Sequence, residues 1–258
     1  MRNIHVLAAA LLCGPCLMAQ APVFTDTFES GKIDPAKYDQ RVTGAATIAV
    51  EPADGAHGKY ALHIHYPEGA RNSYAFVFAT HLPDSVRTHM FGRAYMKVSG
   101  GLGATHNPLI LSGGAGWPAS KFYEIGSRGL PGPMPSFMPS FQENKSKTAA
   151  DGRGEITYHS DGVIPMDKWF LLEWEFNDNP ASITLWIDGQ KVTTTLPTGE
   201  KIDNVKFEWP KASGTVNGLI GGLEEVGFGT RVWGAPTAAI DVWYDDIAVG
   251  PARIGPAK

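Results

Sequence analysis

Arg93, Tyr95 and Lys97 are spaced so that one strand would present all three side chains on the same face. They lie in the segment MFGRAYMKV, where they alternate with smaller or apolar residues. Tyrosine can act as a general base, and arginine or lysine can neutralise negative charge that develops on a reacting group. Aromatic rings beside polar groups also suit sugars, because rings stack on apolar sugar faces while polar side chains bond the hydroxyls.

Further side chains of the same chemical types follow along the chain. His106 and Tyr158 are alternative candidates for a base, although an ordinary solvated strand face would carry the same residue types. The candidate catalytic residues are Arg93, His106, Arg128 and Tyr158, and the candidate substrate-binding residues are Tyr95, Lys97, Glu124, Gln142, His159 and Arg231.

Two other constellations must be weighed against this one. Glu173 and Glu175 share a strand face, as the acid and nucleophile of a glycosidase can, and Glu124 could complete such a pair with either. A solvated outer face or a structural ion pair would explain the two glutamates equally well. His63 and His65 also share a face, but alternating histidines on a strand are more often exposed or packed on the sheet than bound to metal, so a metal role is the less favoured interpretation of this pair.

The elements that must position these residues are strands. In residues 169–189, WFLLEWEFNDNPASITLWIDG, apolar residues alternate with period two, and NDNP and DG provide turns. This predicts a hairpin that is covered on both faces. About a dozen short strands of this kind, with hardly any helical periodicity, predict an all-β jelly-roll sandwich of two antiparallel sheets, with the first and last strands adjacent. Residues 126–154 have no period and are expected to form a long loop over the sheet.

The N-terminal segment has the layout of a secretory signal peptide. Arg2 precedes an apolar run at 6–12 and small residues near Ala19, so we predict a signal at 1–19 and a single domain at 22–255. Both cysteines lie in that signal, so the mature domain would form no disulfide. The net charge of −4 gives no basic field for nucleic acid or for an acidic membrane surface.

Several short motifs together resemble the core domain of Cip-type (cellulose-induced) fungal secreted proteins. In order along the chain they are DTFESG (26–31), AHG (56–58), GRAYMK (92–97), GLGATH (101–106), IG (125–126), LWIDG (185–189), VGFG (226–229) and VWYDDIAV (242–249). The resemblance implies a calcium-stabilised, concanavalin A-like jelly roll whose cleft is similar to that of glucuronan and alginate lyases. In this chain Glu124 stands where the family is expected to have a cleft arginine, and Arg128 follows on the same face as a replacement cation.

This resemblance implies an extracytoplasmic polysaccharide lyase. Such an enzyme removes the proton next to a uronic acid carboxylate by β-elimination. The alternatives are a non-catalytic carbohydrate-binding protein and a glycoside hydrolase of the same fold. We expect a secreted or periplasmic monomer whose partner is a polysaccharide, with no nucleic acid partner and no membrane association after signal cleavage.

A structural calcium site is expected where three distant segments meet. Glu29, the Gly-containing loop 54–60 and Asp245-Asp246 would join if the first strand pairs with the last. Asp245 shares the parity of core residues and is therefore better aimed inward than Asp246. The resemblance implies Glu29 and one of the two aspartates as side-chain ligands, with backbone carbonyls near His57 and Tyr60. Alternatively, the two aspartates only place charge on an edge strand.

Overall fold

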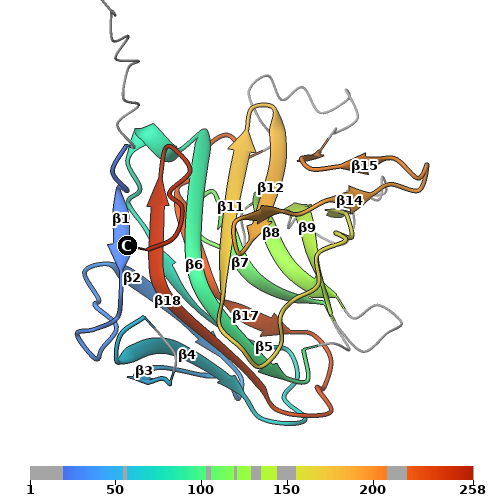
Figure 1. Cartoon of the computed structure of the whole chain (residues 1–258). Helices are drawn as coiled ribbons and strands as arrows, with labels where there is room; N and C mark the ends of the chain where they lie inside the picture. The colour runs from blue at the N-terminus through green and yellow to red at the C-terminus, as the bar shows by residue number, and fades with distance from the viewer. Residues whose placement is uncertain are drawn as a thin grey trace, which may run out of the picture.

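The computed structural model describes residues 20–54, 57–102, 106–118, 121–128, 135–143, 155–207 and 220–257. Two large antiparallel sheets pack face to face in this part of the chain (Figure 1). The two-sheet sandwich predicted from the alternating strands is confirmed. The signal peptide predicted at 1–19 lies outside the described residues.

Sheet A has nine strands, seven of them in the order β13-β12-β11-β6-β18-β4-β3, with β1 beside β18 and β16 beside β12. These strands are β1 (Phe24–Asp26), β3 (Thr47–Pro52), β4 (Tyr60–Tyr66), β6 (His89–Gly100), β11 (Phe170–Asp178), β12 (Ala181–Ile187), β13 (Gln190–Lys191), β16 (Val205–Lys206) and β18 (Ile240–Gly250). The pairing of β1 with β18 confirms that the first and last strands are adjacent.

Sheet B has seven strands in the order β10-β9-β8-β7-β17-β5-β2. They are β2 (Tyr38–Thr43), β5 (Ser73–Ala79), β7 (Asn107–Gly113), β8 (Lys121–Arg128), β9 (Ser136–Glu143), β10 (Glu155–Thr157) and β17 (Glu225–Val232). The short strands β14 (Thr194–Thr195) and β15 (Lys201–Ile202) form a separate hairpin that projects to one side (Figure 1). One 3-10 turn, η1 (Asp84–Val86), is the helical element of the described residues.

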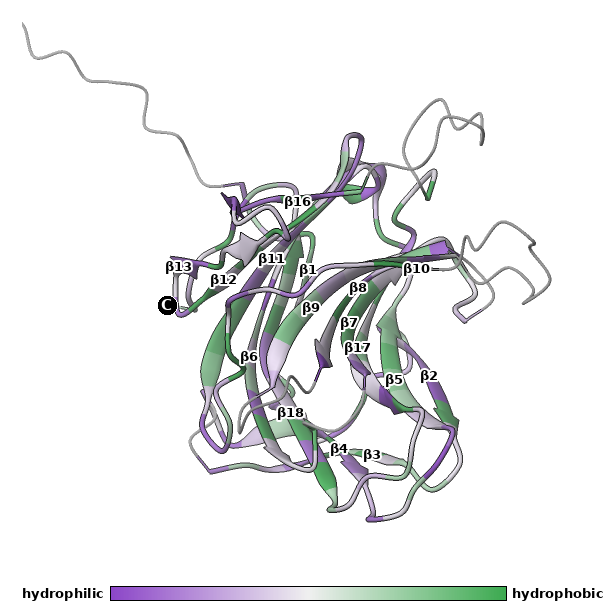
Figure 2. Cartoon of the chain, turned by 90° about the vertical axis from the view of Figure 1, so that its right-hand side faces the viewer, coloured by the Kyte–Doolittle hydropathy of each residue, from purple (hydrophilic) through white to green (hydrophobic). Residues whose placement is uncertain are grey.

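One core fills the space between the sheets. The predicted hairpin is β11 and β12, and its Trp174 and Phe176 are fully buried. Trp174 contacts Phe228 of sheet B edge to face, and the hydroxyl of Tyr244 in sheet A donates to the Leu109 carbonyl of sheet B (2.7 Å). Hydrophobic residues concentrate along the strands, and the connections are mostly hydrophilic (Figure 2). Burial of these side chains holds the sheets together, because buried apolar area is the main stabilising contribution.

The loop predicted over 126–154 is wrong in part. β8 extends to Arg128, and residues 136–143 form β9, a full strand that pairs with β8 along its length. Phe137 and Phe141 point into the core, whereas Ser140 lies on the outer face opposite Glu124. The period-two alternation of β9 was not recognised in the sequence, because proline is unusual within a strand and Pro139 lies in the middle of this one. Its missing N–H lies on the β10 side, where β10 ends at Thr157.

None of the helices in the described part of the chain is long and apolar enough to cross a membrane.

Candidate functional site

The predicted catalytic group is divided between the two sheets. Arg93, Tyr95 and Lys97 lie on β6 and point away from the core on the outer face of sheet A. His106, Glu124 and the other candidates belong to sheet B, whose outer face is on the opposite side of the sandwich. The two sets therefore do not converge on one substrate.

The β6 side chains have structural partners. Arg93 donates through Nη1 to the Gly255 carbonyl (2.8 Å), and the Lys97 ammonium lies over the Trp243 ring, 5.0 Å from its centroid. Tyr95 packs against the His57 imidazole, with ring centroids 3.6 Å apart. Burial is the main cause that raises the pKa of Tyr95. A tyrosine with a raised pKa is a weaker candidate for a base, since the base must lose its own proton first.

Tyr158 also lies apart from the other candidates. Its ring packs edge to face on Phe207 and contacts the core, and its hydroxyl donates to the Lys206 carbonyl (3.2 Å). Tyr158 therefore points inward, and the next residue, His159, points to the outer face of sheet B.

A histidine–carboxylate pair lies on the outer face of sheet B. Nε2 of His106, which precedes β7, is hydrogen-bonded to Oε1 of Glu124 on β8. Gln142 on β9 donates to the other carboxylate oxygen of Glu124 (2.8 Å). The Glu124 side chain is 1% exposed, whereas that of His106 is 22% exposed. The carboxylate is thus held from two strands and orients an accessible imidazole. We call His106, Glu124, Gln142 and Arg231 the sheet B site.

Gly126 leaves space for this pair. A Cβ atom at this position would lie 2.5 Å from Glu124 Oε1 and 3.4 Å from His106 Cδ2. The first distance is too short for two non-bonded atoms, so a side chain here would displace the carboxylate, whereas the second is an ordinary van der Waals contact. The absence of a side chain at 126 is therefore a requirement of the site.

Arg231 on β17 is the cation of the sheet B site. Its guanidinium lies 3.2 Å from the centroid of the Trp233 ring, and its Nε is buried without a hydrogen-bond partner. Burial lowers the pKa of Arg231, and the charges of Tyr74 and Glu124 oppose that shift. Asn107, next to His106, donates to the Arg231 backbone carbonyl (2.9 Å), so the cation and the base candidate come from bonded strands.

Other buried polar atoms without partners share this face of sheet B. Nδ1 of His159 has none, while its Nε2 accepts from Nη1 of Arg128 (2.9 Å). Burial and then the Arg128 charge lower the pKa of His159. The hydroxyls of Ser136 and Ser140 on β9 are also unpaired. Because buried polar atoms normally have partners, bound ligand or water would satisfy these groups.

Another part of this face is covered by the protein's own side chains. The ring of Trp117 packs against an apolar cluster on the outer side of β5, β7 and β8 that comprises Phe76, Phe78, Leu111 and Phe122. Beside it Arg41 forms a bidentate pair with Glu225 (2.9 and 2.8 Å). Among the residues that the structure describes, the part of the face around His106 and Arg231 combines a base candidate with an unpaired cationic donor.

Three residues of this region were not predicted from the sequence. Trp233 is 45% exposed and lies two positions after Arg231. Residues two apart on a strand share a face, so this pattern could have predicted a cation beside an aromatic ring. Asn107 and Gly126 gave no such signal, because their roles depend on contacts between strands.

The carboxylate alternative is not assembled. Glu173 on β11 is bound by Arg253 through Nε (3.0 Å) and Nη2 (2.7 Å), and Glu175 is bound by His89 Nε2 (2.6 Å). Both glutamates lie on the outer face of sheet A, whereas Glu124 lies on that of sheet B. Glu124 therefore does not form an acid pair with either, and the partners of Glu173 and Glu175 are those of structural ion pairs.

The three segments of the expected calcium site do meet. Glu29 Oε1 accepts from the Lys59 and Tyr60 amides (2.8 and 3.0 Å), and Asp245 Oδ2 accepts from the His57 amide (2.9 Å). We call this region the β1–β18 junction.

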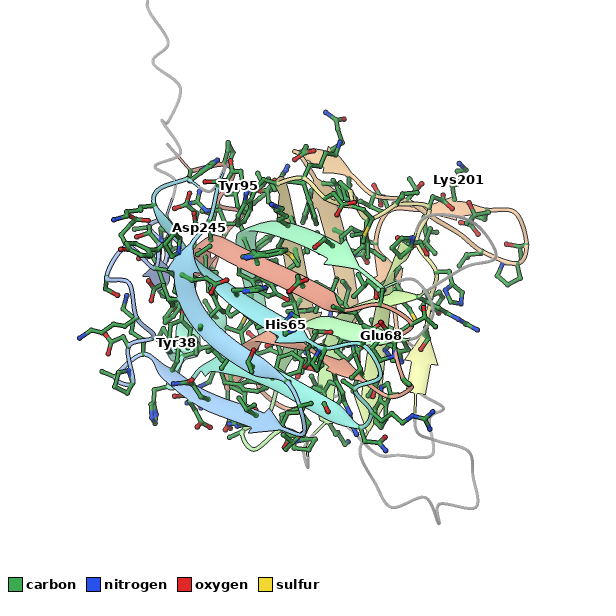
Figure 3. All side chains as sticks on the ribbon, turned by 90° about the horizontal axis from the view of Figure 1, so that it is seen from below. Tyr38, His65, Glu68, Tyr95, Lys201 and Asp245 are labelled. Carbon is green, nitrogen blue, oxygen red and sulfur yellow. The ribbon has the colours of Figure 1, made fainter. Side chains whose placement is uncertain are left out.

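Asp245 lies opposite Tyr95 in sheet A, and the two are seen together in Figure 3. The prediction that Asp245 shares the inward parity of the core residues is therefore wrong. A β-bulge between Asp245 and Ala248 shifts the alternation, so that Ile247 and Val249 face the core while Asp245 lies on the side of Tyr95.

Negative charge accumulates at the β1–β18 junction. Burial raises the pKa of Asp245 to about 6, and the charges of Asp246 and Glu29 add to that rise. Asp246 adopts a positive φ of 46° beside a β-bulge, and its carboxylate contacts His57 Nδ1 (2.7 Å). Clustered carboxylate oxygens beside a loop are the donor set that calcium prefers. The loop amides of His57 and Tyr60, rather than their carbonyls, face the carboxylates.

The chain resembles solved structures in fold. "Cellulose induced protein, Cip1" matches with a TM-score of 0.61 and 17% identity, and an endo-β-1,4-glucuronan lyase from the fungus Trichoderma reesei matches with 0.59 and 13%. Each match covers 91% of this chain and all of the other. The binding domain of botulinum neurotoxin DC matches with 0.52 and 12%, over 91% of this chain and 49% of that one.

These likenesses confirm the jelly-roll fold and the predicted structural resemblance to the Cip-type core. No protein-family model and no curated protein sequence matches the chain.

Proposed function

We propose that this protein is an exported polysaccharide lyase that cleaves a uronic acid-containing glycan at the sheet B site. The observation that carries the proposal is the half-buried guanidinium of Arg231, whose buried Nε has no hydrogen-bond partner and which interacts electrostatically with Glu124 of the His106–Glu124 pair. A desolvated cation with an unused donor suits a carboxylate, since charge-assisted hydrogen bonds are the strong ones. One of the similar folds is that of a glucuronan lyase, which supports the choice of reaction.

In the proposed reaction, Arg231 pairs with the uronate carboxylate and stabilises the negative charge that develops on it. The imidazole of His106 takes the proton from the carbon next to the carboxylate, and Glu124 stabilises the resulting imidazolium. The electrons of that C–H bond form a carbon–carbon double bond. The bond to the glycosidic oxygen breaks, and this oxygen takes up a proton. Glu124 and Gln142 act as positioning residues.

The decisive experiment compares products on several glycans. The protein is incubated with glucuronan, alginate and neutral β-glucans, and ultraviolet absorbance of unsaturated uronic ends is followed beside the release of reducing ends. Both signals on an acidic glycan support the lyase. Reducing ends without the ultraviolet signal mean hydrolysis and overturn the proposal.

A non-catalytic binding protein is the second candidate. The half-exposed Trp233 ring next to Arg231 favours it, because an aromatic ring beside a cation binds a sugar acid without any base. Retention on insoluble glycan without either product would select this function. Botulinum neurotoxin type C, whose cell entry depends on interaction with two ganglioside molecules, has a similar fold over 48% of its chain, with a TM-score of 0.52 at 12% identity.

A structural calcium ion is part of the proposal. Glu29 and Asp245 would hold it at the β1–β18 junction with the loop around His57 and Tyr60. When bound, it would neutralise the clustered carboxylates and tie β1, β18 and the loop together. An exported monomer that acts on polysaccharide outside the cytoplasm is consistent with these features and with the predicted signal at 1–19.

A further inference from the structure

A second cluster of potential ligands lies on the outer face of sheet A, far in the fold from the sheet B site. His63 and His65 project from β4, and Asp241 projects from β18 directly opposite His65. Asp241 Oδ1 lies 2.9 Å from His63 Nε2 and 2.7 Å from His65 Nδ1. In Figure 3, His65 is seen on this face apart from Tyr95 and Asp245. The ligand atoms all lie within 4.8 Å of one another.

His63 is held from its other side as well. Its Nδ1 lies 2.5 Å from Glu51 Oε1 on β3, and its ring stacks on Trp243, with centroids 4.4 Å apart and planes 2° from parallel. A carboxylate on the far nitrogen of a metal-bound histidine is the usual outer partner of a metal ligand, because it fixes the tautomer and the ring orientation.

The hydrogen-bonding geometry of His63 also favours a bound cation. Both of its ring nitrogens face carboxylate oxygens, one from Glu51 and one from Asp241. A neutral imidazole has a single N–H, so one of the two contacts would join two acceptors. Either a second proton or a metal ion on Nε2 satisfies the ring. Asp241 Oδ1 faces His65 in addition, which brings three donor atoms to one point.

We propose that His63, His65 and Asp241 bind a divalent transition-metal ion of the Zn²⁺ class. Two imidazole nitrogens and one carboxylate oxygen form a common ligand set for zinc, with water in the fourth position. The ligand side chains of His63, His65 and Asp241 are 15%, 39% and 23% exposed, so an ion can enter from solvent. Bound there, it would cross-link β4 to β18, and Glu51 would extend the restraint to β3.

His89 provides a matched comparison on the same face. It pairs with Glu175 at 2.6 Å, as His65 pairs with Asp241, and no third ligand joins them in the metal-ligand clusters of the described residues. If a histidine–carboxylate pair were enough to bind metal, the His89–Glu175 pair would also bind it. The proposal requires three ligands, so it predicts that the His89–Glu175 pair binds none.

The test uses the chain without a histidine tag. EDTA first removes bound metal ions, and millimolar calcium is then added so that the occupancy of the β1–β18 junction is the same in every measurement. Zn²⁺ is titrated by calorimetry, and Co²⁺ is added as a visible-absorption probe of a four-coordinate site. The wild type and His89→Gln should bind one ion with the cobalt band. His65→Gln and Asp241→Asn should lose the band, and Glu51→Gln should bind roughly 10–100-fold more weakly.

Circular dichroism of each variant checks that it is folded. His65 is partly exposed, so His65→Gln removes little core packing. The proposal is overturned if the wild type binds no Zn²⁺ or Co²⁺. It is equally overturned if folded His65→Gln and Asp241→Asn bind as the wild type does.

Discussion

The outer faces of the two sheets carry the same kinds of side chain in different states. On sheet A, His89 and Glu175 form a pair, and Glu173 is bound by Arg253. On sheet B, Arg231 retains a buried donor without a partner next to the His106–Glu124 pair. Charged residues whose donors are filled stabilise a fold, whereas an unfilled buried donor costs free energy unless a ligand satisfies it.

This difference in hydrogen bonding, rather than residue type, is why we propose the sheet B face as the site of reaction. Arg93 and Lys97 resemble Arg231 in chemistry, but their positions on sheet A remove them from the sheet B site. Four measurements test the two faces and the β1–β18 junction.

The largest expected effect is on catalysis at His106. Replacing His106 by Ala removes the proposed base, and a general base typically contributes roughly 10²–10⁴-fold to the rate. The matched change His89→Ala removes a histidine that is also paired with a glutamate, but on sheet A. Steady-state release of unsaturated ends should fall only in the first variant. If His106→Ala and His89→Ala were equally active, His106 on sheet B would have no catalytic role that His89 on sheet A lacks.

Arg231→Gln should produce the next largest loss. Removing one group that stabilises developing charge costs roughly 10²–10³-fold in turnover. Lys191→Gln is the control, because Lys191 is a cation beside Trp186 of sheet A, 6.0 Å from the ring centroid. Activity on acidic and neutral glycans is compared for both variants. If Arg231→Gln retains full activity on the acidic polymer, carboxylate recognition must lie elsewhere.

The calcium proposal predicts a stability change rather than a change of chemistry. At a calcium concentration of about 100 times Kd, binding stabilises the fold by roughly 2.7 kcal/mol. For a chain of this size the midpoint of thermal unfolding should rise by about 5–10 °C. Each variant is measured in EGTA and in millimolar calcium. The calcium-dependent shift should persist in Asp203→Ala, an exposed surface carboxylate.

Asp245→Ala and Glu29→Ala should lose that shift whatever their own midpoints are. A shift of unchanged size in both variants would place any calcium elsewhere.

The smallest effect is on the titration of His159. Its pKa is lowered by burial and by the neighbouring Arg128 charge. Arg128→Gln should therefore raise it toward the ordinary histidine value, as followed by NMR. In the wild type the unfolded chain binds a proton more readily than the folded chain. Stability should thus fall as the pH drops through the ordinary histidine pKa of about 6.5. A pKa of His159 that is unchanged in Arg128→Gln would contradict the assigned contact.

The period-two patterns determined much of the fold by themselves. Alternation in 169–189 and along β6 correctly separated inward from outward side chains, since successive residues on a strand point to opposite faces. The pairing of the first strand with the last also followed from the sequence, and it brings Glu29 to Asp245. Strand β9 was not predicted, because Pro139 and the serines obscure the alternation of apolar and polar residues along it.

Which outward residues face the same side of the molecule depends on how the strands are arranged into sheets. Parity places Arg93 and Glu124 outside the core alike, yet β6 joins sheet A and β8 joins sheet B. That choice depends on long-range strand pairing, which local alternation does not encode. For the same reason the contacts of Gly126 with Glu124 and of Asp241 with His63 and His65 arise only when strands distant in sequence are placed side by side.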